Sequence, residues 1–199
     1  MKEGNNGGYA NNWLVADRKT NEVASLELGL KNVILQRTRD GFFVGSNFPA
    51  DPKLAKEETD FDLADRGRSE NARHARWLAL MEQHKGRIDA ALAQKFLADH
   101  FDAYENTNAV SERTLCGHID SSTRGMGTWQ PPFAPAGAVQ NKVSDAANAE
   151  KMSMLALLGH ACGHSFKAAE HLAKHPEFAW QRETLKDMPA RAWTRFTAK

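Results

Sequence analysis

Residues 13–47 read WLVADRKTNEVASLELGLKNVILQRTRDGFFVGSN, and this stretch decides the fold class. Polar turn residues separate four apolar runs, at 13–17, 23–30, 32–37 and 42–46. Side chains alternate along 23–28, and an Asp-Gly pair at Asp40 precedes the last run. Alternation and Asp-Gly turns are typical of antiparallel strands joined by hairpins. We therefore expect an antiparallel β-meander of four strands over 13–47.

The rest of the chain has helical character. Residues 49–68 are charged, interrupted by prolines and lack a steady period, which predicts a long surface connection. Two helices are expected within 69–104, at 70–84 with Ser69 as N-cap and at 88–104. Over 138–199 we expect one strand, a helix from Asp145 to Gly159 and short helical pieces. The prediction is a single α+β domain over 1–199, with the β-meander packed against helices.

Composition excludes two classes of partner. The 199 residues carry 26 Lys plus Arg against 25 Asp plus Glu, a formal net charge of +1. Dedicated nucleic-acid binders show a basic excess or a basic stripe. No apolar run approaches the ~20 residues that span a bilayer. We therefore predict no nucleic-acid partner and no transmembrane segment.

A group of histidines and cysteines is a candidate metal site. His160, Cys162 and His164 lie close together, and Cys116 and His118 form a second group upstream. A pair of histidines four apart on a helix can hold zinc. Glycines bracket the motif, however, and no glutamate stands where a metalloprotease base would. The prediction is therefore an ordinary helix end, with no metal and no cofactor, while a disulfide between the two cysteines stays open.

Three polar residues in the first half of the chain become candidate site residues only when they are considered together. Asn47 ends the last apolar run, Arg73 lies on the first predicted helix, and Asn11 precedes the first strand. Asparagine is a routine turn residue and arginine is common on solvated helix faces. Each residue alone has an ordinary structural explanation.

Their order along the chain resembles a known superfamily. The run YANNWLVADRKTNEVASLELGLKNVILQRTRDGFFVGSNFP (9–49) is followed by SENARHARW (69–77) and later by PAGAVQNKVSDAANAEKMSM (135–154). These motifs resemble the C-terminal half of N-terminal-nucleophile hydrolases. The similarity is greatest to phospholipase B-like and acyl-coenzyme A:6-aminopenicillanic acid acyltransferase-like (peptidase C45-like) proteins, with choloylglycine hydrolases more distant. It covers roughly 8–166.

The resemblance implies a fold and a chemistry. The fold would be part of an αββα sandwich, and the activity would be hydrolysis or acyl transfer at amide or ester bonds of an acylated small molecule or lipid. Asn47 matches the asparagine whose amide stabilises the oxyanion. Arg73 matches an arginine that orders the site beside the nucleophile. Asn11 would be a supporting substrate-binding residue.

One departure from the family decides what the chain can do. These enzymes use an N-terminal cysteine whose own α-amino group is the base. Cys116 and Cys162 are internal and lie downstream of Asn47, so the nucleophile must come from upstream. We expect a C-terminal fragment or subunit that is inactive alone and binds its missing N-terminal half or a second copy. The alternatives are a non-catalytic binding module of the same fold and a small zinc protein using His160, Cys162 and His164.

Overall fold

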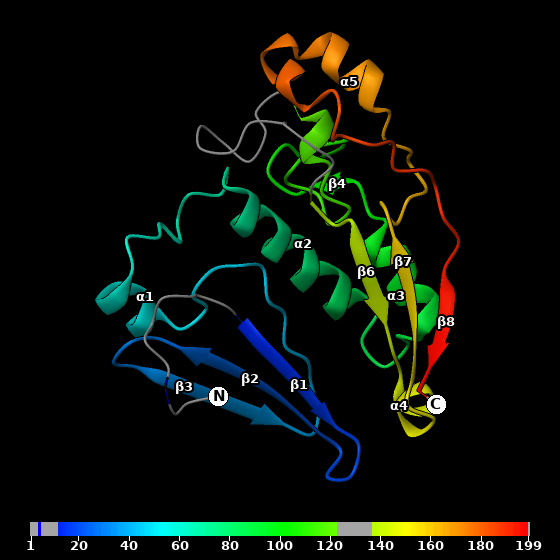
Figure 1. The fold of residues 1–199 in the computed structure, drawn as a ribbon. Coiled ribbons are helices and arrows are strands. Elements are labelled where there is room, and N and C mark those ends of the chain that lie inside the picture. The colour runs from blue at the N-terminus through cyan, green and yellow to red at the C-terminus, as the bar shows by residue number, and fades with distance from the viewer. Residues whose placement is uncertain (1–3, 5–11, 123–136, 199) are drawn as a thin grey trace. The chain divides into compact units, whose positions relative to one another are not determined.

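The structure is a computed structural model of the chain that describes Gly4, residues 12–122 and residues 137–198. It consists of two compact units, Met1–Lys85 and Gly86–Lys199. Each unit combines antiparallel strands with helices (Figure 1), which confirms the predicted α+β class. Among the helices of the described ranges, none has the length and apolar content needed to cross a membrane.

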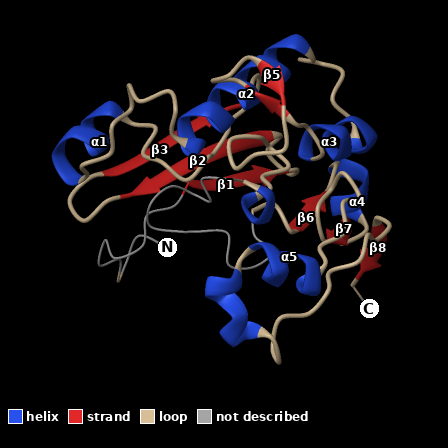
Figure 2. Cartoon of the chain, turned by 90° about the horizontal axis from the view of Figure 1, so that it is seen from above, coloured by secondary structure: helices blue, strands red, loops and turns tan. Residues whose placement is uncertain are grey.

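The first unit is built on a three-stranded antiparallel sheet. It is formed by β1 (Asn12–Asp17), β2 (Glu22–Leu28) and β3 (Val33–Thr38), in that order, as Figure 2 shows. The prediction of a fourth strand at 42–46 is wrong, because this segment is irregular and pairs with no strand of the described chain. It passes close to β1 instead. A Cβ on Gly45 would lie 2.8 Å from Cβ of Asn12, so only glycine permits this approach.

The two faces of this sheet have different chemistry. Trp13, Leu26 and Leu35 are cross-strand neighbours on one face, where Trp13 is 37% exposed and Leu35 49%. Asn12 and Glu27 are neighbours on the other face, and Glu27 is only 5% exposed. The polar face is therefore the covered one, and the apolar face is largely open.

Helix α1 (Pro52–Glu58) lies inside the predicted surface connection, where the sequence shows no steady helical period. The Asp51 side chain caps α1 by accepting hydrogen bonds from the Lys53 and Leu54 amides. At the other end, the Glu58 carboxylate accepts hydrogen bonds from the backbone amides of the β2–β3 turn. Local capping chemistry in a charged, proline-containing stretch thus makes a helix that apolar periodicity does not reveal.

Helix α2 (Ser69–Gln83) follows the predicted span within one residue at each end. Its N-cap is Arg68 rather than Ser69. Ser69 is the first helical residue, and its Oγ accepts a hydrogen bond from Arg73 Nε at 3.0 Å. The predicted cap residue therefore positions a side chain of the next helical turn instead of capping the helix.

The second unit has a three-stranded antiparallel sheet, a small hairpin and short helices (Figure 1). The sheet has the order β6-β7-β8. In chain order the elements are α3 (Ala90–Leu97), β4 (Phe101–Asp102), β5 (Thr107–Asn108), the 3-10 helix η1 (Ile119–Ser121), β6 (Gln140–Val143), α4 (Ala146–Glu150), β7 (Ser153–Leu158), α5 (Ala168–Lys174), the 3-10 helix η2 (Pro176–Gln181) and β8 (Thr194–Thr197).

Two predicted helices of this unit are shorter than expected. The helix expected over 88–104 ends at Leu97, and Asp99 then accepts a hydrogen bond from the Phe101 amide as the chain enters the β4–β5 hairpin. The helix expected up to Gly159 stops at Glu150, and Met152 adopts a left-handed φ of 47°. Strand β7 follows and pairs with both β6 and β8. Sheet pairing thus decides the conformation of an apolar run that is compatible with either structure.

Candidate functional site

Two clusters of polar side chains are built by the fold, one in each unit. The first surrounds Asn47, which has a left-handed backbone φ of 65°. Arg73 reaches this segment from the first turns of α2. Its Nη1 donates to Asn47 Oδ1 at 3.2 Å, and its Nη2 donates to the Ser46 carbonyl oxygen at 3.3 Å. Together with the bond to Ser69, three interactions fix the guanidinium plane.

This pairing determines which way the Asn47 amide points. A guanidinium has donors only, so the atom that faces Arg73 must be the oxygen of the amide. The Nδ2 group therefore points away from Arg73. Asn47 is exposed, and its Nδ2 donates to no described residue. The result is an exposed amide donor held in a defined orientation by a charged neighbour.

The charge of Arg73 persists in this setting. Burial lowers the pKa of Arg73 below its ordinary value, while the negative charge of Glu70 opposes the shift. An arginine remains protonated at physiological pH. A positive charge therefore lies beside the Asn47 amide, where it favours any anion that the amide binds.

A buried glutamate supports the segment that carries Asn47. Glu27 Oε1 accepts from the Asn12 side chain and from the Ala50 amide, both at 2.8 Å, and Oε2 accepts from the Asp51 amide at 2.9 Å. Asn12 Nδ2 also donates to the Phe48 carbonyl oxygen at 3.0 Å. These bonds attach the chain after Asn47 to the covered face of the sheet.

The sequence predicts Asn47 and Arg73, and the structure brings the two together. Asn11 lies outside the described residues. Its neighbour Asn12, which sequence reasoning passed over, contacts the segment after Asn47 instead. Glu27 was also missed, because a polar residue in an alternating strand normally faces water. Two buried polar atoms of this region, Ser46 Oγ and Asn12 Oδ1, have no hydrogen-bond partner among the described residues.

The second cluster gathers histidines and cysteines in the other unit. The ligand-type atoms of His100, Cys116, His118 and Cys162 all lie within 4.8 Å of one another. His118 Nε2 lies 3.1 Å from His100 Nε2 and 3.4 Å from Cys162 Sγ. Cys116 and His118 are fully buried, Cys162 is exposed, and neither cysteine is in a disulfide.

The zinc site considered from the sequence has a different set of ligands, His160, Cys162 and His164. His160 is buried and its Nε2 is 3.0 Å from Asp120 Oδ1, so it pairs with a carboxylate and stacks on His118 at 3.8 Å between ring centroids. His164 belongs to a second group, with His118 and Asp120. Of the three predicted ligands, only Cys162 lies in the four-residue cluster. His100 was missed because nothing near it in the sequence marks it as a ligand.

Burial sets the protonation of the inner pair. It lowers the pKa of His118 to about 3, with the neighbouring His160 adding to the effect. It also raises the pKa of the Cys116 thiol to about 12. Without a bound ion, His118 is therefore a neutral imidazole and Cys116 a neutral thiol at physiological pH. A thiol in this state is a poor nucleophile.

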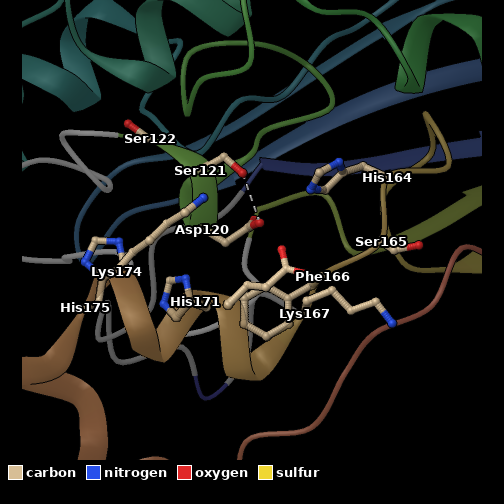
Figure 3. A pocket seen from close by; sticks show the side chains of 11 residues that line it. Asp120, Ser121, Ser122, His164, Ser165, Phe166, Lys167, His171, Lys174 and His175 are labelled. Atoms are coloured by element: carbon tan, nitrogen blue, oxygen red, sulfur yellow. Dashed lines mark hydrogen bonds between the residues drawn. The ribbon is translucent and has the colours of Figure 1, made fainter.

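A pocket of about 360 Å³ lies beside the second cluster. Figure 3 shows Asp120 and Ser121 of η1 above α5, which contributes His171. Ser121 Oγ donates to Asp120 Oδ2 at 3.3 Å, so the Asp120 carboxylate is bound on both oxygens. Lys167, at the rim, forms an ion pair with Asp187 at 3.0 Å. The polar groups named here are thus largely engaged with one another.

Comparisons with known proteins assign the chain to no family. No family model matches it, and neither a curated protein nor a solved structure is significantly similar to it.

Proposed function

We propose that the chain is the C-terminal part of an N-terminal-nucleophile hydrolase or acyltransferase that acts on amide or ester bonds of an acylated small molecule or lipid. The observation that carries the proposal is the hydrogen bond from Arg73 Nη1 to Asn47 Oδ1. It orients the Asn47 amide as an outward donor, which is what an oxyanion site requires. The motif resemblance selected both residues on independent grounds.

In this proposal the nucleophile is a cysteine at the start of a segment upstream of Asn47. Its α-amino group takes the thiol proton, and the sulfur attacks the substrate carbonyl carbon. The carbonyl electron pair moves to oxygen, where Asn47 Nδ2 donates a hydrogen bond. Collapse of this intermediate breaks the bond to the amine or alcohol, which leaves with the proton. Water then hydrolyses the thioester and regenerates the thiol.

The cysteines of this chain do not compete for the role. Cys116 is fully buried with a neutral thiol, and Cys162 lies in the other cluster. Both also follow Asn47 in sequence, whereas the family order puts the nucleophile first. Asn47 and Arg73 thus supply electrostatic stabilisation and orientation, not the attacking group.

The open sheet face supports a partner for the first unit. Trp13, Val15 and Leu35 are 37%, 52% and 49% exposed on one side of β1–β3, opposite the side covered by the 46–51 segment. In an αββα sandwich each sheet has helices on one face and a second sheet on the other. A sheet with one covered face and one bare apolar face fits half of such a sandwich.

The test begins with the coding sequence upstream of Met1, read in frame for a cysteine-led segment. Protein made with that segment is assayed for carboxylic acid released from a panel of N-acyl amides and fatty-acyl esters. We expect hydrolysis that disappears when the upstream cysteine is replaced by alanine. Hydrolysis that survives this replacement would contradict the cysteine nucleophile. A complete protein that is inactive across the panel would favour the non-catalytic module.

A further inference from the structure

Four ligand-type side chains converge in the second unit from three separate segments. His100 follows α3, Cys116 and His118 lie in the loop before η1, and Cys162 lies in the turn after β7. We propose that His100, Cys116, His118 and Cys162 form a tetrahedral zinc site. Two thiolates and two imidazoles are a ligand set that zinc favours in structural sites. The site is independent of Asn47 and Arg73 and of the proposed reaction.

The distances match the size of a zinc ion. Bonds of ~2.0–2.3 Å in a tetrahedron separate neighbouring ligand atoms by roughly 3.3–3.8 Å. His118 Nε2 is 3.1 Å from His100 Nε2 and 3.4 Å from Cys162 Sγ. The remaining pairs lie within 4.8 Å, so side-chain shifts of about 1 Å complete the coordination.

Hydrogen bonding alone does not account for the position of His118. One ring nitrogen carries either a single proton or a single lone pair. His118 Nε2 nevertheless faces two neighbours at hydrogen-bond distance, and one of them is another imidazole nitrogen. A cation between these atoms satisfies all of them together, because each then offers a lone pair to the same ion.

The backbone around the ligands is already fixed. The Cys116 amide donates to the Asp99 carbonyl oxygen, and the His118 amide donates to the Ser111 carbonyl oxygen, each at 3.0 Å. A buried ion pair, Arg113 Nε to Asp102 Oδ2 at 2.7 Å, attaches the loop that carries both ligands to β4. The site is thus preorganised, which lowers the entropic cost of binding an ion.

A competing set shares one residue with this site. His118, Asp120 and His164 also lie within reach of one another. Asp120, however, already accepts hydrogen bonds from His160 on one oxygen and from Ser121 on the other. A metal bound there would compete with these hydrogen bonds for the Asp120 oxygens. The set with two cysteines keeps that pair intact and offers one more ligand.

Four protein ligands leave no open coordination position, so the ion has a structural role. It would join the end of α3, the loop before η1 and the turn after β7. Exposure of Cys162 provides the path by which the ion enters. Binding of zinc in this way contributes directly to the stability of the second unit.

The test uses the full chain purified without chelator, with metal content measured by elemental analysis and affinity by competition with a chromogenic chelator. We expect one zinc per chain and a thiolate-to-metal charge-transfer band after cobalt substitution. Cys162→Ser should weaken zinc binding by ~100-fold or more and remove part of that band. His164→Ala is the matched control, and it should leave affinity unchanged. Chelator should lower the Tm of the wild type by ~5 °C or more, but not that of Cys162→Ser.

Each other outcome overturns the site. Zinc loss in His164→Ala with retention in Cys162→Ser would assign the ion to the set with Asp120. A folded wild type that takes up no zinc when titrated with both thiols reduced would leave only a hydrogen-bonded cluster. A disulfide between Cys116 and Cys162 that persists under mild reductant would assign the cysteines to a covalent link instead.

Discussion

Replacing Glu27 tests how the segment after Asn47 is held. Glu27 is 5% exposed and accepts three hydrogen bonds, from Asn12 Nδ2 and the Ala50 and Asp51 amides, at 2.8–2.9 Å. Glu27→Ala removes both acceptor oxygens and leaves three N–H groups without their acceptor, although Asn12 Nδ2 keeps its other bond to the Phe48 carbonyl oxygen. Each unsatisfied buried donor costs ~1–3 kcal/mol, and water entering the vacated space restores part of this. We expect the free energy of unfolding to fall by about 3 kcal/mol.

Two assays together separate a local effect from a general one. Urea unfolding followed by tryptophan fluorescence gives the loss of stability. Glu22→Ala is the control on the same strand, because no side-chain hydrogen bond joins Glu22 to the 46–51 segment. Hydrogen exchange gives the local effect. The Ala50 and Asp51 amides should exchange faster in Glu27→Ala than in the control.

A loss below ~1 kcal/mol would refute the reasoning, since it would mean that the three donors find other partners. Unchanged exchange at Ala50 and Asp51 would do the same. The isosteric Glu27→Gln should fall in between. Its oxygen still accepts, but its amide nitrogen faces a donor, which gives an expected loss of ~1–2 kcal/mol.

Three further predictions concern single contacts. Burial tends to raise the pKa of Glu58, but hydrogen bonds from the Asn32, Lys31 and Leu30 amides outweigh it and hold the pKa below its ordinary value of 4.5. The Glu58 carboxylate therefore contributes its full stability above pH 4.5, and this contribution is lost as pH falls through the lowered pKa. In thermal unfolding from pH 3 to 7, the fall in Tm at low pH should be smaller for Glu58→Gln than for the wild type. Gly45→Ala should lower the stability by ~1–3 kcal/mol in urea unfolding, because its Cβ would lie 2.8 Å from Cβ of Asn12; an unchanged midpoint would contradict that close approach. Arg113→Lys should lower the free energy of unfolding by ~2–4 kcal/mol, because one ammonium cannot replace the bonds to both Asp102 and Glu105. The control is Arg37→Lys on the exposed part of β3, which should have no measurable effect on stability.

The sequence predicts the fold class well and the details less well. Alternation along 23–28 correctly indicates antiparallel strands, because strand periodicity is a local property. The same alternation suggests that Ser25 and Glu27 face water, yet that face is covered, because a polar loop lies on it and satisfies Glu27. The apolar run of β7 shows no alternation that would indicate a strand. Its conformation depends on two partner strands that are distant in sequence.

The two candidate clusters differ in how far sequence reasoning reaches them. Asn47 and Arg73 were selected by motif order, and the structure adds the hydrogen bond that orients the amide. The cysteine and histidine cluster required the fold. His100 and Cys162 are remote in sequence, and the Cys116 amide bonds to the carbonyl oxygen of Asp99, the residue before His100. Of the two histidines that flank Cys162 in the sequence, His160 pairs with Asp120 instead.

The central claim is that the Asn47 amide stabilises an oxyanion, and the most direct test is the turnover of Asn47→Gly in the protein that includes the upstream cysteine. Glycine keeps the left-handed backbone at φ 65° without strain and removes only the amide. Asn21→Gly is the matched control, because Asn21 has a similar φ of 53° in the β1–β2 turn. The account predicts a fall in kcat of ~10²–10³-fold for Asn47→Gly and none for the control. Equal turnover in the two variants, with both folded, would contradict it.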